Sequence, residues 1–331
     1  MIHRTAGFLL FLIALPAAAA VRQASDAWPD LTREAGELGH QGRFAEAAAV
    51  LRRMVRLADQ PGQDPERTSA ACNWLAVVYD ELGRSADAEH EYRRSLALLE
   101  RSGGRTTAEY AQVLSNLAAH YADLGRDDEA APLLREAIGT FRSIRPEPPL
   151  GLALARDAMA MVAMHAGRYQ EADALEQQAV QALEKLPGSA EQYGIALGNL
   201  ATLRRSEGYP EEAVGIAHRA FETLEKALGP DHPRLIPALN TLAAAQMDLK
   251  HVEEAGAALS RALKLAETRL GTDHLLYGRV LLNYSVFVRK CGDRKRAGKL
   301  EAQAREILDQ HARANGTNMT VDAAAFRSGN R

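Results

Sequence analysis

The sequence predicts an all-α protein, an α-solenoid of about seven helix-turn-helix units. Three recurring features predict this fold, because self-similarity at a fixed period marks a repeat architecture. A glycine-centred turn returns at steps of 41 or 42 residues, as in LGRS, LGRD and AGRY. A small residue lies seven positions before each turn, and an alanine lies five positions after it. The turns are centred on Gly42, Gly83, Gly125, Gly167, Gly208, Lys250 and Gly292.

The two small-residue positions indicate that helices pack closely at both places. A larger side chain at either position would hold the backbones apart. The residues before the turns are Ala35, Ala76, Ala118, Ala160, Ala201, Ala243 and Ser285. The residues after the turns are Ala47, Ala88, Ala130, Ala172, Ala213, Ala255 and Ala297.

Each unit is expected to place one helix before its turn and one helix after it. In the third unit, apolar residues spaced by three and four run through EYAQVLSNLAAHYADL and DDEAAPLLREAIGTF, which is the pattern of one buried helix face. Proline and glycine cluster between units, as in RPEPP at 145–149, where they interrupt helices. The units are therefore placed at about 28–60, 66–102, 107–144, 149–187, 189–229, 232–271 and 274–311.

Two joints between units carry a similar motif, LGPDH at 228–232 and LGTDH at 270–274. Paired aspartate and histidine could be half of a metal site, but these pairs recur at the repeat period. Equivalent joints one repeat apart hold their side chains apart, whereas ligands must converge within about 2 Å of one ion. We expect glycine to end one helix and aspartate to cap the next. No metal is therefore predicted at Asp231, His232, Asp273 or His274.

The run LGPDHPRLIPALNTLA, together with SNLAAHYADLGRDDEA at 115–130, resembles tetratricopeptide repeats. It is similar to the long, 42-residue variety found in kinesin light chains and many bacterial proteins. The resemblance covers roughly residues 28–311. It implies a right-handed superhelix whose first helices line a concave groove, and it implies a role in partner binding. Repeat four departs from the pattern, with Arg156 in place of leucine and Ala163 in place of tyrosine.

Asparagine is confined to one place in the repeat. Each of the five asparagines between residues 21 and 311 lies two or three residues before the small first-helix residue. Asparagine inside a helix costs about 0.5 kcal/mol relative to alanine, so an offsetting role is expected. Helix geometry points these side chains away from the buried stripe, toward the face that the resemblance assigns to the groove. The candidate groove residues are Asn73, Asn116, Asp157, Asn199, Arg205, Asn240, Asn283 and Arg289.

Two interpretations of these amides remain open. They could bond the backbone of an extended peptide, since an amide offers both donors and an acceptor. They could instead bond the neighbouring repeat and stiffen the solenoid. The same face is expected to have a small or apolar floor at Val77, Ala119, Met161, Thr202, Ala244 and Val286. It is expected to be acidic early and basic late, from Asp80, Glu81 and Asp123 to Arg205, Arg289 and Lys290, with Asp248 as an exception.

The N-terminal stretch predicts export. Arg4, the apolar run at 7–15 and the alanines that follow are typical of a signal peptide, and the run is too short to span a bilayer comfortably. We expect residues 1–20 to be removed, giving a periplasmic or extracellular protein with no stable membrane insertion. The small, polar segment 312–331 is expected to be a disordered tail.

The composition excludes several classes of function. A formal net charge of −3 and 5% aromatic residues disfavour nucleic-acid binding, which uses basic patches and stacking rings. Glycine-rich phosphate loops, nucleophile elbows and zinc-type cysteine pairs are not found, so neither an enzyme nor a cofactor is predicted. Cys72 and Cys291 lie in distant repeats and are expected to remain half-buried, unpaired thiols.

These observations predict an exported scaffold that binds a protein or an extended peptide in its groove. The alternative is a sensor or regulator, in which the groove binds a small peptide or glycan ligand and relays a change of superhelix pitch.

Overall fold

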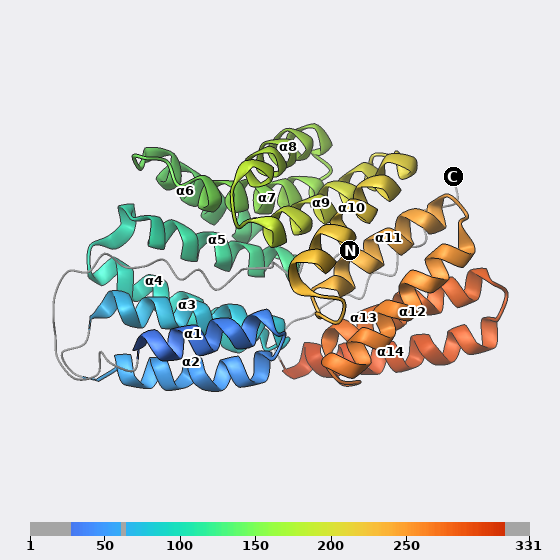
Figure 1. The fold of residues 1–331 in the computed structure, drawn as a ribbon, viewed down its shortest axis with the longest axis horizontal. Coiled ribbons are helices and arrows are strands. Elements are labelled where there is room, and N and C mark those ends of the chain that lie inside the picture. The colour runs from blue at the N-terminus through green and yellow to red at the C-terminus, as the bar shows by residue number, and fades with distance from the viewer. Residues whose placement is uncertain (1–27, 61–63, 315–331) are drawn as a thin grey trace.

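The computed structural model describes residues 28–60 and 64–314, which form fourteen α-helices and one short 3-10 helix. Successive helices pair into seven hairpins, one in each expected unit, and build the predicted right-handed α-solenoid (Figure 1). The first three hairpins are α1 Trp28–His40 with α2 Phe44–Ala58, α3 Pro65–Glu81 with α4 Ser85–Arg101, and, after η1 Gly104–Thr106, α5 Ala108–Asp123 with α6 Asp127–Ser143. The other four are α7 Pro149–His165 with α8 Tyr169–Lys185, α9 Ala190–Ser206 with α10 Pro210–Leu228, α11 Leu235–Asp248 with α12 Val252–Arg269, and α13 Leu275–Lys290 with α14 Arg294–Ala314.

The turn inside each hairpin depends on left-handed backbone. Six of the seven turns place glycine there, for example Gly167 at φ 73°, because glycine has no Cβ to clash in this conformation. In the sixth turn Lys250 adopts φ 63°, and it is the only non-glycine residue with positive φ in the described part of the chain. The recurring glycine of the sequence is therefore a requirement of the backbone.

Several helices begin at residues whose chemistry favours a helix start. The side chain of Asp64 accepts a hydrogen bond from the backbone N–H of Glu66 at 2.9 Å, and Pro65 occupies the first turn of α3. Thr107 accepts one from the N–H of Tyr110 at 3.2 Å, which caps α5.

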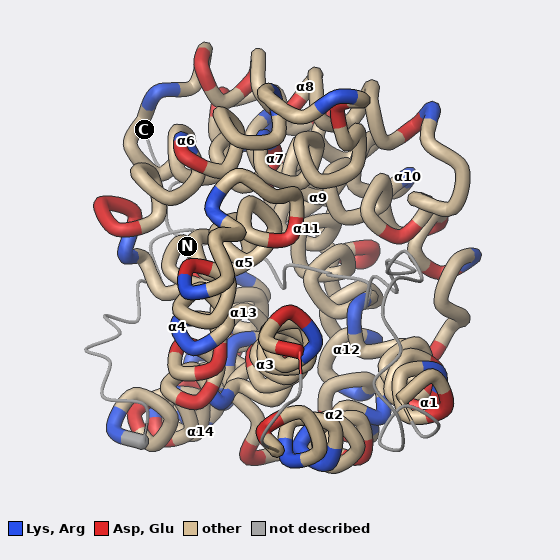
Figure 2. The backbone as a smooth tube through the Cα atoms, turned by 90° about the vertical axis from the view of Figure 1, so that its left-hand side faces the viewer, with Lys and Arg blue, Asp and Glu red and all other residues tan. Residues whose placement is uncertain are grey.

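The hairpins form two layers. The first helices, such as α5 and α7, are buried on nearly all sides, whereas α6 and α8 bury a single stripe. Figure 2 shows α3, α5 and α13 inside the ring of outer helices. The alanines flanking the turns, including Ala118 and Ala130, are fully buried between the layers. The close packing expected from the two small-residue positions is thus present.

The hydrophobic core is not continuous along the array. One large cluster runs from Leu31 to Val162, and a second runs from Leu224 to Leu308. Three small clusters lie between them, formed by residues of α7–α11. Ala163, which departs from the tyrosine pattern, belongs to one of these small clusters. The largest apolar clusters therefore lie toward the two ends of the solenoid.

The array curves until its two ends touch. Pro233, just before α11, lies against the turn at Gly42, so that a Cβ added to Gly42 would meet Pro233 Cδ at 2.6 Å. Leu275 and His311 lie in the same way against the turn at Gly83. Figure 1 accordingly shows α1–α3 beside α11–α14. We call this arrangement, in which repeats one and two lie against repeats six and seven, the closed ring.

The ends of the chain differ in part from expectation. Helix α14 continues to Ala314, so residues 312–314, expected in the tail, are helical. The predicted signal segment 1–20 and the remaining tail lie outside the described residues. Within the described ranges, no helix is long and apolar enough to cross a membrane. Cys72 and Cys291 are both free, but Cys72 is buried and Cys291 is exposed rather than half-buried.

Candidate functional site

The early asparagines of the predicted groove bond each other. Asn116 on α5 donates to the side-chain oxygen of Asn73 on α3 at 2.9 Å, and Gln112 donates to Asn116 at 2.8 Å. Asn73 and Asn116 are only 9% and 3% exposed. These two amides therefore link neighbouring repeats.

The next pair repeats this arrangement with one carboxylate. Asn199 on α9 donates to Asp157 on α7 at 2.7 Å, and both side chains are buried. The expectation that the early side chains face solvent is thus wrong for Asn73, Asn116, Asp157 and Asn199. Helix periodicity considers one helix at a time, whereas the first helices pack along one another on this face. The interpretation of the amides as braces is supported for these two pairs.

The late asparagines behave differently. Asn240 on α11 and Asn283 on α13 are half-buried. The side-chain oxygen of Asn240 is buried and has no hydrogen-bond partner among the described residues. Leaving such an acceptor unsatisfied costs about 1–3 kcal/mol, and Asn240 is therefore the amide best suited to accept a ligand N–H.

The charged candidate residues form ion pairs within the protein. Arg205 donates to Asp248 of the next repeat at 2.5 Å, and its side chain is buried. Arg289 is exposed but ion-paired with Glu301 of α14. Glu81, expected at the acidic end, pairs with Arg234 at 2.8 Å. The expected change from acidic to basic along the groove is largely neutralised by these pairs, and Asp248 is explained as the partner of Arg205.

The floor residues are also less accessible than expected. Val77, Ala119, Met161, Thr202 and Ala244 are all buried, and only Val286 on α13 is half-buried. The accessible part of the concave face thus lies toward the late repeats.

Arg279 is a candidate that the sequence analysis did not single out. It lies on α13 one turn before Asn283, so the two side chains share a helix face. Burial lowers the pKa of Arg279 to about 10, and the opposing attraction of Asp123 on α5 is weaker. No carboxylate among the described residues lies within ion-pairing distance of its guanidinium. A half-buried guanidinium without a carboxylate partner is suited to binding a ligand carboxylate.

The wall formed by α3, α4 and α5 carries a buried polar network. Tyr92 donates to Asp80 at 2.9 Å, and His120 Nδ1 lies 2.6 Å from the other oxygen of Asp80. Burial alone would lower the pKa of His120, but the Asp80 carboxylate outweighs it and the pKa is raised. The Nε2 atom of His120 is buried without a partner. The network joins repeats two and three.

The histidines of the two joints are placed by hydrogen bonds at both ring nitrogens. His232 Nδ1 accepts from the backbone N–H of Arg234 at 3.2 Å, and His274 Nδ1 accepts from that of Leu276 at 3.1 Å. Their Nε2 atoms lie 3.4 Å from the carbonyl of Gly39 and 3.1 Å from the carbonyl of Glu81. Each histidine therefore carries its proton on Nε2 and joins the two ends of the ring.

These contacts correct the expected capping role of the aspartates. The backbone N–H groups expected to bond Asp231 and Asp273 bond histidine instead, since the imidazole Nδ1 reaches the same position. Asp231 pairs with Arg269 at 3.1 Å. Burial lowers the pKa of both His232 and His274 to about 4, so both are neutral at pH 7. Over the described ranges, no group of three or more potential ligands is placed to hold a metal ion.

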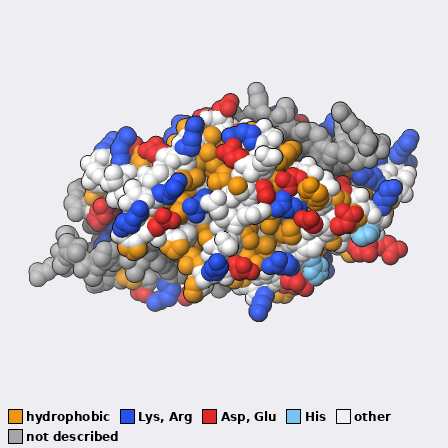
Figure 3. All heavy atoms as spheres, turned by 90° about the horizontal axis from the view of Figure 1, so that it is seen from above, with side chains coloured by type: hydrophobic (Ala, Val, Ile, Leu, Met, Phe, Trp, Pro, Cys, Tyr) orange, Lys and Arg blue, Asp and Glu red, His pale blue; other side chains and the backbone are white. Residues whose placement is uncertain are grey.

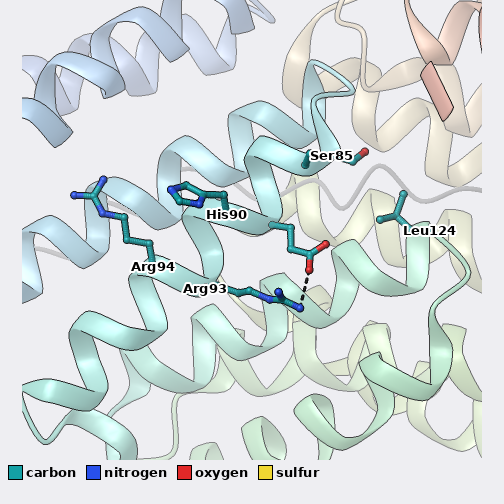
Figure 4. A pocket seen from close by; sticks show the side chains of 7 residues that line it. Ser85, His90, Arg93, Arg94 and Leu124 are labelled. Carbon is teal, nitrogen blue, oxygen red and sulfur yellow. Dashed lines mark ion pairs between the residues drawn. The ribbon is translucent and has the colours of Figure 1, made fainter. Parts of the chain in front are cut away.

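A separate pocket of about 480 Å³ lies on α4. Figure 4 shows Arg93, Arg94 and His90 among the residues that line it, together with Ser85 and Leu124. Arg93 pairs with Glu89 at 2.7 Å, and Arg94 pairs with Asp59. Because both guanidinium groups have carboxylate partners, this pocket is not a strong anion site. None of the predicted groove residues lines it.

The fold and the inner layer define an α-solenoid repeat protein. The tetratricopeptide-repeat family profile matches residues 66–143, 152–189 and 195–234. A curated relative, Protein KINESIN LIGHT CHAIN-RELATED 2 of Arabidopsis thaliana, is 25% identical over 237 residues, which are 70% of this chain and 35% of the relative. This chain thus spans about a third of that relative's length. These matches support a tetratricopeptide-repeat protein whose repeats are similar to those of kinesin light chains.

Two solved structures share this fold over nearly the whole chain. A Rap protein complexed with competence and sporulation factor has a TM-score of 0.63 at 15% identity, covering 89% of this chain and 83% of its own. NprR in complex with its cognate peptide NprX has a TM-score of 0.64 at 13% identity, covering 93% and 87%. At these identities the similarity shows the fold alone.

Proposed function

We propose that this protein is a non-catalytic scaffold that binds a protein or an extended peptide on the concave face formed by its first helices. The observation that carries the proposal is the unpaired polar chemistry of the late repeats. Asn240 presents a buried acceptor without a donor, and Arg279 presents a guanidinium without a carboxylate. A ligand that supplies both partners would remove both costs.

The same two groups define the chemistry of the ligand. A peptide backbone N–H matches the Asn240 oxygen, and a carboxylate matches the planar, two-pronged guanidinium of Arg279. Asp80 lies on an early helix, where it would repel a second carboxylate. The ligand is therefore an extended peptide with its acidic group directed toward α13. The cognate peptide held by the NprR structure supports a peptide ligand for this fold.

We further propose that the protein is exported and works in the periplasm or outside the cell. Arg4, the apolar run that follows it and the alanine-rich stretch support this proposal. N-terminal sequencing of the native protein tests it. A mature chain that starts after about residue 20 is expected, and one that still begins at Met1 would return the protein to the cytoplasm.

The second candidate function is a sensor in which ligand binding changes the pitch of the superhelix. The contact between the two ends of the ring favours it, because a ligand between the ends would change that contact. Wild-type protein with and without a selected peptide would give different small-angle scattering curves in a sensor and superimposable curves in a rigid scaffold.

A display library of random nonapeptides with free C-termini tests the binding proposal. We expect peptides with an acidic residue or terminal carboxylate to be enriched on the wild-type protein. Their affinity should fall at least tenfold with Arg279→Gln and with Asn240→Ala. Arg269→Gln, at an exposed pair on the outer helix α12, is the matched control and should leave affinity unchanged. Enrichment that does not depend on Arg279 or Asn240 would place the site elsewhere.

A further inference from the structure

The contact between the ends of the ring is centred on Arg234, just before α11. Its guanidinium donates to Glu81 at the end of α3, with nitrogen–oxygen distances of 2.8 and 2.9 Å. It also pairs with Glu191 in the first turn of α9. All three side chains are at most 7% exposed. One arginine thus ties repeat two to repeats five and six across the ring.

Smaller contacts flank this ion-pair cluster on both sides. The ring of His232 lies edge-on to Phe44 of repeat one, with centroids 6.2 Å apart. His232 and His274 each reach a backbone carbonyl 193 residues away. Pro233 lies on the turn at Gly42. The same five-repeat spacing is therefore used twice, once at each joint.

A buried ion-pair cluster lies at the centre of this contact, whereas the repeat-to-repeat interfaces bury mainly aliphatic and aromatic side chains with a few neutral or singly charged polar pairs. Two carboxylates share one guanidinium, and one oxygen of Glu191 is buried without a hydrogen-bond partner. Burial raises the pKa of Glu81 against the opposing effect of Arg234. Desolvation of buried ion pairs offsets much of their attraction. The contact therefore fixes the arrangement of the ends while contributing little net stability.

We propose that the contact around Arg234 is a latch. The protein alternates between the closed ring and an open superhelix in which repeats one and two separate from repeats six and seven. Opening exposes the side chains of Arg234, Glu81 and Glu191, which are buried in the closed ring. That this exposure admits a ligand rests on the proposed function, but the latch itself does not.

Distance measurement by electron paramagnetic resonance tests the latch without any ligand. Spin labels are attached to the exposed Cys291 of repeat seven and to Arg53→Cys, an exposed position on α2, in a Cys72→Ala background. The parent should give one dominant distance. In Arg234→Ala, the fraction of molecules with a longer distance should be at least several-fold larger than in the parent.

Arg204→Ala is the matched control. Arg204 also bridges two carboxylates at 2.6 Å each, but Asp173 lies on the preceding helix α8 and Glu207 directly follows Arg204's own helix α9. Its loss should leave the end-to-end distance unchanged. An Arg234→Ala protein with full helical circular dichroism and the parent distance overturns the latch. If Arg234→Ala loses its helical signal, Glu191→Gln decides the test instead. Glu191→Gln should also enlarge the fraction of molecules with the longer distance. An unchanged distance distribution in Glu191→Gln overturns the proposal. Peptide binding enters neither result, so failure here is distinct from failure of the proposed function.

Discussion

Asn116 donates a hydrogen bond to the side-chain oxygen of Asn73, 43 residues earlier in the chain, at 2.9 Å. Neither side chain is well exposed to solvent. The bond joins the first helices of two successive repeats, and Asp157 and Asn199 are joined in the same way. The asparagine positions therefore serve two purposes along the array: early residues brace the repeats, and Asn240 keeps an acceptor available.

Replacing single asparagines separates these purposes. Asn116→Ala should lower the free energy of unfolding by about 1–3 kcal/mol, because it leaves buried partners on Asn73 and Gln112 unsatisfied. Asn240→Ala should leave it unchanged or raise it by up to about 3 kcal/mol, since removing the unsatisfied acceptor relieves about 1–3 kcal/mol and alanine favours helix. Denaturant titrations of the two variants make the comparison. Equal losses at both positions would contradict the division.

Lys250 provides a test of the turn geometry. Lys250→Gly should raise the free energy of unfolding by about 0.5–1 kcal/mol, because a left-handed conformation costs a side-chain-bearing residue about 1–2 kcal/mol, part of which is offset by the entropy of glycine. Gly167→Lys is the converse variant, since a Cβ there meets no atom within 4 Å and only the backbone is strained. It should lower the melting temperature. If both variants shifted the melting temperature in the same direction, this explanation of the recurring glycine would be refuted.

The two joint histidines predict loss of stability in acid. In the folded protein their pKa values are lowered from 6.5 to about 4, so the unfolded chain binds protons first. Their contribution is complete above about pH 6.5 and is lost as the pH falls toward 4.

The neighbouring charges act on this trend in different directions. Arg234 and His40 favour neutral His232, and Glu191 opposes them; His311 and Arg279 favour neutral His274, and Asp273 opposes them. The pKa of Glu81 is raised in the folded protein, so protonation of Glu81 as the pH falls favours the folded state and partly opposes the effect of the histidines. The melting temperature is measured at pH 7.5 and at pH 4.5. The drop between the two should therefore be smaller in a His232→Asn, His274→Asn double variant than in the parent. An equal fall in both would show that the histidines do not carry the acid sensitivity.

The helix pairs and their turns were predictable because they depend on local chemistry. A left-handed turn selects glycine, and close helix packing selects alanine, wherever the unit recurs. The burial of Asn116 was not predictable from one helix, because the neighbouring first helices that cover it belong to other units. The same limit applies to the joints, where His232 and His274 contact residues five repeats away.

Arg234 and Arg279 show which signals sequence reasoning missed. Arg234 directly follows the Asp-His-Pro run of one joint, and this position was the available signal. Its partner Glu81 lies 153 residues away in the chain, so the pairing was not predictable. Arg279 stands one turn before Asn283, where repeat three has Gln112 bonded to Asn116. A basic residue in that slot of the last repeat was the available signal.

Site-specific photo-cross-linking tests the central claim, that a partner binds the concave face, most directly. A photoreactive amino acid is placed at half-buried Val286 on α13 or at exposed Glu136 on the outer helix α6, and the protein is irradiated with an acidic peptide selected from the library. Covalent capture at Val286, reduced by Arg279→Gln and absent at Glu136, is the predicted result. Capture at Glu136 with none at Val286 would contradict binding in the groove.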